Sequence, residues 1–224
     1  MYNTIMKVND YMRIKERTEK AIELLEKMYP EVKCSLDYTT PVEMLIATQM
    51  SAQCTDAAVN RVTKDLFKKY TSVDDFADAK LEELQQDIKS IGLYRNKAKN
   101  IILCCQRLRD AYGGKVPDTM EELLTLPGTG RKTANLVLGD IYKKPAVVVD
   151  THCKRIAARI GLTKNTDPAK VETDLKKIIP PEKQLETCHR FVYHGRALCN
   201  ARAPKCMDCM LAKEGVCKYF STVK

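Results

Sequence analysis

The sequence predicts an all-α protein, and three observations support this. Apolar residues recur at the helical spacing i, i+3, i+4 and i+7 in three segments, residues 21–28, 98–105 and 134–141. The breakers between helical segments are short Pro and Gly clusters, and no long linker divides the chain. Only residues 146–149 have the composition of a strand, and so short a run does not form a sheet alone. We therefore expect helices in two lobes that contact one another.

Local signals predict where several helices begin. Pro41 and Pro168 suit the first turn of a helix, where a missing backbone N–H leaves no intrahelical bond unmade. Asp118 and Thr119 precede a helical segment with acidic residues in its first turn, which complement the helix dipole. Asp150 is a favoured residue type for capping a helix that begins near Thr151.

The overall composition is that of an ordinary globular protein. The chain has 224 residues, of which 44% are hydrophobic and 30% charged, enough for one large domain or two small ones. No apolar stretch approaches the roughly 18 residues that span a bilayer, so we expect no membrane segment. The N-terminus lacks the apolar region of a secretion signal, so the predicted location is cytoplasmic. A monomer is the default expectation.

The charge balance favours a polyanionic partner. The chain carries 38 Lys and Arg against 29 Asp and Glu, a formal net charge of +9. A basic surface attracts phosphate backbones before any specific contact forms. A protein that is merely basic is the alternative, so charge by itself only places nucleic acid among the candidates.

The ten cysteines are unevenly distributed. Four crowd near the C-terminus in the pattern C-x6-C-x2-C-x7-C. Without a secretion signal, this asymmetry indicates reduced thiols and a local metal site, and it argues against a disulfide framework. Four thiolates suit an iron–sulfur cluster or a zinc ion, but zinc sites usually show two close pairs and here only one pair is close. The spacing favours a [4Fe–4S] cluster. The four candidates are Cys199, Cys206, Cys209 and Cys217.

A Pro-Gly hairpin lies between two helical patterns at residues 126–134. Gly128 and Gly130 permit positive φ and close approach of a ligand to the backbone. The helix after Gly130 presents free N–H groups and its positive dipole end, an arrangement suited to a DNA phosphate. A tight helix–helix turn is the more common meaning of such residues. Arg131 and Lys132 favour the functional interpretation, because cations oppose the dipole at a helix start.

The hairpin and the segment Val149–Arg155 together resemble the helix-hairpin-helix signature of the endonuclease III family, and the spacing of Lys132 and Asp150 agrees with it. The resemblance runs from about Cys34 to Cys217. It includes two further matched segments, Met50–Asp56 and Ile91–Tyr94.

The resemblance implies a two-lobed helix-hairpin-helix DNA glycosylase fold with a C-terminal [4Fe–4S] cluster loop. One lobe would be a helical bundle at residues 33–144 that contains the hairpin. The second would combine residues 1–32 with residues 145–224 and hold the cluster. The DNA cleft would lie between the lobes, with Lys132 at its mouth and Asp150 across it.

The implied activity is a bifunctional DNA glycosylase and abasic-site lyase of base-excision repair, acting on double-stranded DNA with an oxidised pyrimidine or an abasic site. Lys132 would be the amine nucleophile, and Asp150 would stabilise positive charge on the sugar. A helix start and the neighbouring Arg131 favour the neutral amine. Taken singly, Lys132 could be a phosphate contact and Asp150 only a helix cap. Related adenine and thymine-mismatch glycosylases lack this lysine, so Lys132 favours the bifunctional branch.

Several further roles are implied only by the resemblance. Gln53 and Leu93 would fill the gap left by an extruded nucleotide, although a solvated Gln and a core Leu are the ordinary alternatives. Arg202 and Lys205, between the first two cluster cysteines, would contact the DNA backbone. His152 would support Asp150.

The cysteine pattern departs from the family at one point. The family pattern is C-x6-C-x2-C-x5-C, whereas the last loop here, residues 210–216, is two residues longer. Cys217 remains the candidate for the fourth ligand. We expect a mainly structural cluster that holds the shape of the preceding loop.

The sequence leaves undecided the roles of three basic residues and two other classes of function. Arg95, Lys97 and Lys99 could line the DNA face or an exposed helix side.

A non-catalytic helix-hairpin-helix DNA-binding protein and an iron–sulfur redox sensor are the alternative functions. Neither alternative explains the hairpin, the Lys132 and Asp150 pair and the cysteine cluster together.

Overall fold

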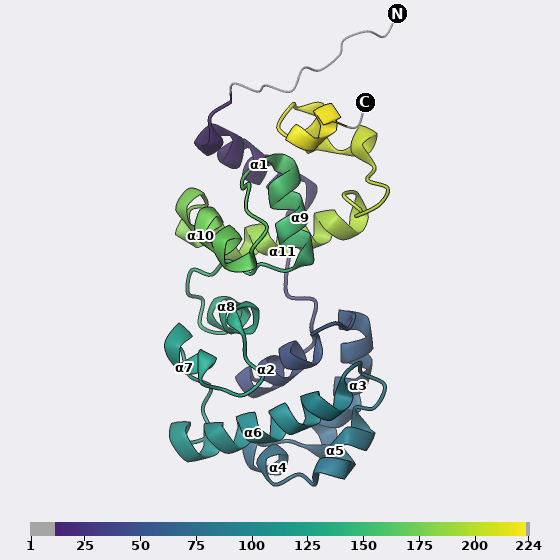
Figure 1. The fold of residues 1–224 in the computed structure, drawn as a ribbon, viewed down its shortest axis with the longest axis vertical. Coiled ribbons are helices and arrows are strands. Elements are labelled where there is room, and N and C mark those ends of the chain that lie inside the picture. The colour runs from purple at the N-terminus through teal and green to yellow at the C-terminus, as the bar shows by residue number, and fades with distance from the viewer. Residues whose placement is uncertain (1–11, 223–224) are drawn as a thin grey trace, which may run out of the picture. The chain divides into compact units, whose positions relative to one another are not determined.

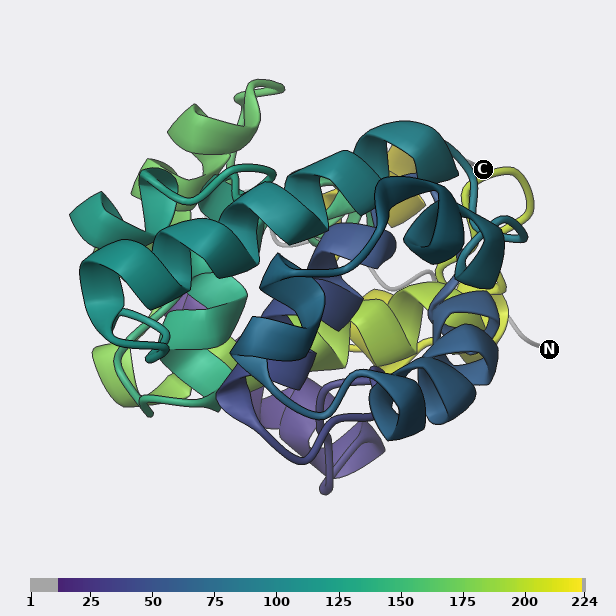
Figure 2. The ribbon, with the colours of Figure 1, turned by 90° about the horizontal axis from the view of Figure 1, so that it is seen from below.

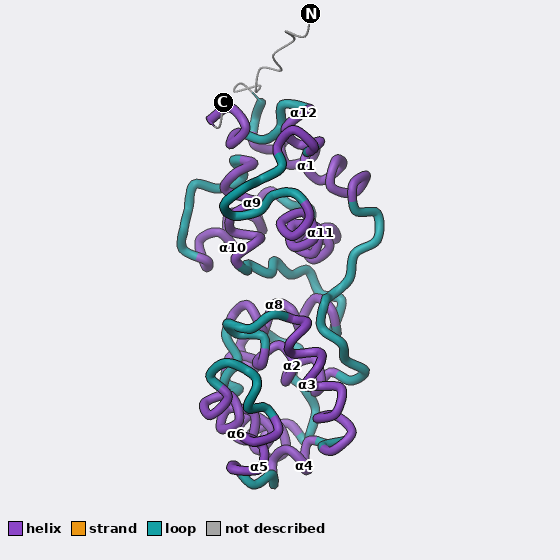
Figure 3. Tube along the Cα trace, turned by 90° about the vertical axis from the view of Figure 1, so that its right-hand side faces the viewer, coloured by secondary structure: helices purple, strands orange, loops and turns teal. Residues whose placement is uncertain are grey.

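The computed structural model describes residues 12–222. Within this range the chain forms helices joined by loops and contains no strand, as the trace in Figure 3 shows. The all-α prediction is confirmed, and residues 146–149 are loop because the described chain offers no strand to pair with them. None of the described helices is long and apolar enough to cross a membrane. Residues 1–11, on which the argument against a secretion signal depends, lie outside the described residues.

The chain divides into two compact units. Unit 1 comprises Met1–Lys33 and Pro145–Lys224, and unit 2 comprises Cys34–Lys144. Figure 1 labels the main helices of each. Unit 2 contains α2 (Pro41–Met50), α3 (Asp56–Lys69), α4 (Val73–Ala77), α5 (Leu81–Asp87), α6 (Tyr94–Tyr112), α7 (Met120–Leu124) and α8 (Arg131–Asp140). Unit 1 contains α1 (Ile14–Met28), α9 (Thr151–Ile160), α10 (Pro168–Ile178), α11 (Gln184–Ala197) and α12 (Met210–Lys213), with short 3-10 turns at Pro181–Lys183, Cys206–Asp208 and Lys218–Thr222.

The helix starts follow the local signals in the sequence. Pro41 and Pro168 occupy the first turns of α2 and α10, as predicted. Thr40 caps α2 in a capping box with Glu43, whose carboxylate accepts the Thr40 backbone N–H. Thr119 caps α7 by accepting from the Glu122 N–H. These starts depend only on residues within one turn, which explains why the sequence predicts them.

The core of unit 2 forms around the 19-residue helix α6, which runs across the unit in Figure 2. Its buried face, which includes Ala98 and Ile101, packs into one hydrophobic cluster with side chains of neighbouring helices such as Met50 and Leu66. Burying each Ile or Leu contributes about 1.5–3 kcal/mol. This cluster fixes the end of α2 and the beginning of α6, where candidate DNA-contacting residues lie.

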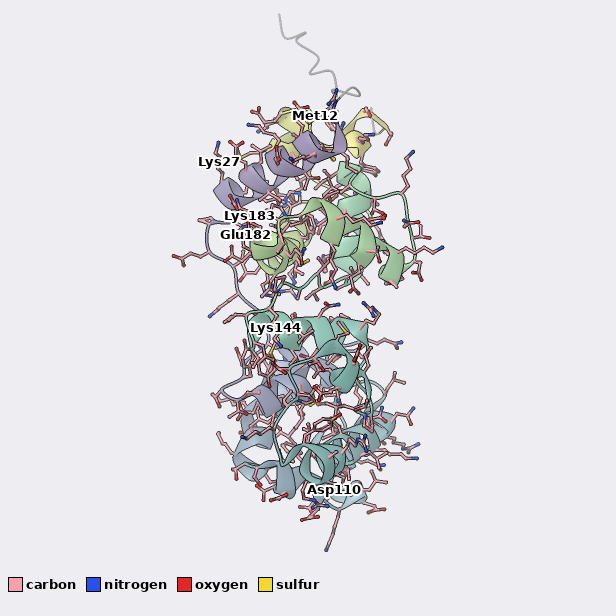
Figure 4. The ribbon with its side chains drawn as sticks, turned by 90° about the vertical axis from the view of Figure 1, so that its left-hand side faces the viewer. Met12, Lys27, Asp110, Lys144, Glu182 and Lys183 are labelled. Atoms are coloured by element: carbon pink, nitrogen blue, oxygen red, sulfur yellow. The ribbon has the colours of Figure 1, made fainter. Side chains whose placement is uncertain are left out.

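In unit 1, helix α1 packs against α10, α11 and α12. An ion pair of 2.9 Å joins Lys183 Nζ, just before α11, to Glu26 near the end of α1. Figure 4 labels Lys183 and Lys27, the neighbour of Glu26. The N-terminal helix is thereby tied to the C-terminal part of the chain, so residues far apart in sequence build one unit.

Candidate functional site

The hairpin between α7 and α8 is held by a side chain of α2. Gln49, which is buried, donates from Nε2 to the Pro127 carbonyl oxygen at 3.1 Å and to Thr129 Oγ1 at 3.2 Å. Helix α8 begins at Arg131, directly after Gly130, as predicted, and Gly130 supplies no side-chain cap. Sequence reasoning missed Gln49, because its partners lie 78 and 80 residues away.

Gly128 adopts the positive φ expected from the hairpin, +77°, whereas Gly130 has a φ of −99°. A Cβ at Gly128 would lie 2.9 Å from Asn100 Cβ and 3.1 Å from Gln49 Oε1, too close without a shift of these neighbours. Glycine is therefore required here both by the backbone conformation and by the close approach of two helices.

Replacing Gly128 by alanine should destabilise the protein more than the same change at Gly113. Both glycines have positive φ, but a Cβ at Gly113 meets nothing within 4 Å. Gly113→Ala should lower the free energy of unfolding by about 1 kcal/mol, and Gly128→Ala by at least about 2 kcal/mol. Urea unfolding of both variants measures the difference. Equal losses would show that the hairpin tolerates a side chain at Gly128.

Lys132 lies in the first turn of α8 and is half-buried. Its Nζ donates to Ser51 Oγ at 3.3 Å, while Ser51 itself donates to the Thr48 carbonyl oxygen at 2.8 Å. The hydroxyl thus presents its lone pairs to the amine. Ser51 belongs to the matched segment Met50–Asp56, but its contact with Lys132 was not visible from sequence.

A cysteine also lies near Lys132 but is a poor competing nucleophile. Burial is the main reason that the pKa of the Cys34 thiol is raised to about 11; the nearby Asp140 carboxylate contributes to this rise, and Lys132 opposes it. At neutral pH this thiol is protonated, and the thiol form is not the reactive one. The amine of Lys132 is therefore a better candidate for covalent chemistry than the Cys34 thiol.

Gln53 and Leu93 share an unusual backbone conformation, with φ of 55° and 61°. Both are exposed, and Leu93 keeps 55% of its surface accessible. Leu93 is therefore not a core residue, which removes the ordinary alternative for it. A Cβ on Gly92 would lie 3.7 Å from the Gln53 carbonyl oxygen, so the two loops touch.

The basic residues at the start of α6 differ from one another. Arg95 and Lys99 are exposed, in keeping with either expected surface. For Lys97 both expectations are wrong, because its side chain is buried, with 6% exposed. Its ammonium group bonds to the carbonyl oxygens of Met50 and Ala52. A residue 47 positions away along the chain supplies one of these acceptors, so local sequence could not reveal the burial.

In unit 1, Asp150 caps α9, as predicted. Its Oδ1 accepts from the Cys153 backbone N–H at 2.7 Å, and the residue is half-buried. The cap bond uses one of the two carboxylate oxygens, Oδ1. Capping the helix is therefore compatible with a chemical role for Asp150.

Helix α9 also links this cap to the C-terminal loop. Arg155 donates to His152 Nδ1 at 3.0 Å and to the Cys199 carbonyl oxygen at 3.1 Å. A guanidinium can only donate, so His152 Nδ1 is the acceptor in this bond. A Cβ on Gly195 of α11 would meet His152 Nδ1 at 2.3 Å, so α11 packs closely behind this ring.

The four C-terminal cysteines Cys199, Cys206, Cys209 and Cys217 line one cavity. Burial raises the pKa of the Cys206 and Cys209 thiols, and that of Cys217 to about 11. Among residues 12–222, no group of three or more His, Cys, Asp or Glu side chains is placed to hold a metal ion. The thiols therefore surround a shared space and do not meet at one point.

Polar side chains face two of the cysteine sulfurs. Arg159 Nη1 donates to Cys199 Sγ at 3.2 Å, and His194 Nε2 lies 3.6 Å from Cys209 Sγ. Tyr29 Oη lies 3.1 Å from the other ring nitrogen of the buried His194. Buried thiolates need positive charge and hydrogen-bond donors. The side chains around this cavity thus suit a sulfur-ligated group.

The loop between Cys199 and Cys206 exposes Arg202 and Lys205, the two predicted DNA contacts. Arg159 holds this loop from α9 through the carbonyl oxygens of Asn200, at 2.8 Å, and Ala201, at 2.9 Å. Neither Arg155 nor Arg159 was singled out from sequence as a support of this loop. The two arginines are four residues apart on α9, and this spacing would have predicted that they lie on the same face of the helix.

Comparisons with known proteins agree over nearly the whole chain. The model of the HhH-GPD superfamily base excision DNA repair protein matches residues 46–181. Endonuclease III of Synechocystis sp. is 50% identical over 200 residues, which cover 88% of this chain and 91% of that protein. Endonuclease III of Bacillus subtilis is 46% identical over 197 residues, with 88% and 90% covered.

A solved structure points the same way. A trapped endonuclease III–DNA covalent intermediate has 45% sequence identity and a TM-score of 0.89, with 93% of this chain and 97% of that chain covered. Neither a non-catalytic DNA-binding protein nor a redox sensor is favoured by these relatives. The chain belongs to the HhH-GPD superfamily of base excision DNA repair proteins and, within it, to the endonuclease III family of DNA glycosylases with abasic-site lyase activity.

Proposed function

We propose that this glycosylase and lyase releases oxidised pyrimidines from duplex DNA and cleaves the strand 3′ to the resulting abasic site, with Lys132 as nucleophile. The observation that carries the proposal is the position of Lys132, whose amine projects from the first turn of α8 to the Ser51 hydroxyl. A relative with 45% identity has been captured in a covalent intermediate with DNA, which supports a nucleophilic route.

The chemistry follows from an amine at the sugar C1′. Lys132 Nζ attacks C1′, the glycosidic bond breaks, and the base leaves with the bonding electrons and a proton. The C1′–O4′ bond then breaks and O4′ takes up a proton, which opens the sugar and leaves a protonated iminium between C1′ and Lys132 Nζ. This iminium acidifies the C2′ proton. Removal of that proton then expels the 3′ phosphate, as the C3′–O bond breaks. The Ser51 hydroxyl accepts from Lys132 in the free protein, which orients the amine before DNA arrives.

Asp150 is proposed to stabilise the positive charge that develops on the sugar as the base departs. Its cap bond from the Cys153 N–H restrains the carboxylate without neutralising it. The N–H groups at the start of α9 also favour a negative charge at this position. The cap bond therefore keeps the carboxylate oriented.

Asp150→Asn separates the charge of this residue from its capping role. Asparagine caps helices as well as aspartate, so thermal stability should hold, whereas base release should slow by about a hundredfold or more. Asp167→Asn is the matched control, because Asp167 caps α10 of the same unit through the Lys170 N–H. Single-turnover base release and the melting temperature are measured for both. Full activity in Asp150→Asn would exclude a role for its charge.

The four cysteines are proposed to hold a [4Fe–4S] cluster. A single zinc ion needs its sulfur ligands about 2.3 Å from one point, whereas thiols spread around one cavity suit a polynuclear group. When bound, the cluster would hold both ends of the loop with Arg202 and Lys205, at Cys199 and Cys206, against Cys209 and Cys217. Those two exposed side chains are proposed to contact the DNA backbone, together with Arg131 and the N–H groups that follow Gly128 and Gly130.

The substrate preference is tested with duplexes that differ in a single base. Thymine glycol, 8-oxoguanine and a thymine–guanine mismatch are compared in single-turnover assays that follow base release and strand cleavage separately. We expect thymine glycol to react fastest and strand cleavage to accompany base release. We also expect the protein to act as a monomer. Preference for the purine lesion, or release without cleavage, would overturn this assignment.

A further inference from the structure

The loop after α2 and the residue before α6 both hold strained backbone in unit 2. Gln53 and Leu93 have positive φ, and Lys143 is the only other non-glycine residue among those described that does. Such conformations are strained and persist only where surrounding contacts impose them. Both side chains are exposed. Because the exposed side chains do not anchor these residues in the core, buried contacts of the neighbouring backbone must hold them in place.

Lys97 supplies contacts to both loops. Its Nζ donates to the carbonyl oxygens of Met50, at 2.8 Å, and Ala52, at 2.7 Å, on either side of Ser51. Its backbone N–H donates to the Leu93 carbonyl oxygen at 3.1 Å and closes the first turn of α6. One residue thus bonds to the backbone next to Gln53 and to the backbone of Leu93.

The burial of Lys97 is otherwise unfavourable. Only 6% of it is exposed, and burial lowers the pKa of its ammonium group. Lysine is almost never fully buried unless it is paired. The compensation lies at the end of α2, where terminal carbonyls lack intrahelical partners and the helix dipole favours a cation. An apolar residue of similar length would fill the space without cost to packing but would leave these carbonyls unbonded.

We propose that Lys97 is a positioning residue that fixes Gln53 and Leu93 relative to one another, so that extrusion of a damaged nucleotide from duplex DNA depends on it. This inference rests on the proposed role of Gln53 and Leu93 in filling the opened duplex. Two side chains that enter one duplex must keep their separation, and a displacement of about 1 Å suffices to lose a large part of the rate. Lys97 itself is buried and acts through these two residues.

The test is Lys97→Met, which keeps the length of the side chain and removes its donors. Lys64→Met is the matched control, because Lys64 is an exposed lysine of α3 in the same unit and its replacement removes the same charge. Extrusion is followed by the fluorescence of 2-aminopurine placed opposite a lesion in duplex DNA. Strand cleavage at an abasic site is measured in both duplex and single-stranded DNA.

We expect Lys97→Met to lose most of the fluorescence change and to cleave the duplex substrate about tenfold more slowly or worse. Its cleavage of the single-stranded abasic site, which needs no extrusion, should match that of wild type. Lys64→Met should behave as wild type in every assay. A general structural defect would instead lower both cleavage rates together, and that result, or an unchanged fluorescence signal, would overturn the inference.

Two further variants keep the outcome decisive. Lys97→Gln retains a polar group for the buried position but is too short to reach both carbonyls, and it replaces Lys97→Met if the latter does not fold. The double variant Gln53→Ala with Leu93→Ala tests the premise. If the double variant still extrudes the nucleotide, the proposed role of these residues fails. If it does not and the Lys97 variants do, only the positioning role fails.

Discussion

Lys132→Gln should abolish the covalent adduct that borohydride traps between this protein and a duplex carrying an abasic site. The variant removes the only atom proposed to form the Schiff base, so strand cleavage should fall by on the order of a thousandfold or more. Arg131→Gln is the matched control, since it removes one positive charge from the adjacent position of the same helix start. It should bind DNA more weakly but still form the adduct at saturating DNA.

The two variants separate chemistry from binding. If Lys132 only contacted a phosphate, both substitutions would weaken binding and both proteins would still be trapped. An adduct formed by Lys132→Gln at the wild-type rate would place the reactive amine elsewhere. Absence of any adduct with the wild type, despite DNA binding, would remove the lyase mechanism proposed for Lys132.

If the four cysteines hold the proposed [4Fe–4S] cluster, Cys217→Ala should yield a protein that has lost its iron and much of its stability. Four thiolates hold one [4Fe–4S] cluster, so loss of a ligand should reduce the iron content from about four atoms per chain to nearly none. Metal-site binding energy is also folding energy, so the melting temperature should drop by more than about 10 °C. Iron analysis, visible absorption and thermal unfolding measure these effects.

Cys188→Ala is the control for this experiment. Cys188 is buried on α11 of the same unit but does not line the cavity that the four cysteines share. It should keep its iron and lose only the packing of a small side chain. Full iron content in Cys217→Ala would show that the longer loop at residues 210–216 brings a different fourth ligand to the cluster.

The helices and their starts could be predicted because their causes are local. Pro41, Thr119 and Asp150 act on N–H groups within one turn of themselves. The same is true of α8, whose start after Gly130 follows from the hairpin. The nucleophile and carboxylate candidates came from a family resemblance, and their chemical roles remain predictions.

The supports of the site could not be read from the chain, because they join residues far apart in sequence. Gln49 holds the hairpin across 78 residues, and Arg155 reaches Cys199 across 44. Leu93 is apolar yet exposed, since the backbone at the start of α6 turns it away from the core.

Lys97 shows most clearly what only the tertiary structure decided. By itself, the sequence determined an all-α chain, the starts of its helices and a cluster of four cysteines, since each depends on spacing or on neighbouring residues. A lysine in the same sequence reads as solvent-exposed, because a buried charge is unfavourable without partners. Its partners are backbone carbonyls at the end of another helix, and backbone groups carry no signature in the sequence. Packing alone brought them within hydrogen-bonding distance.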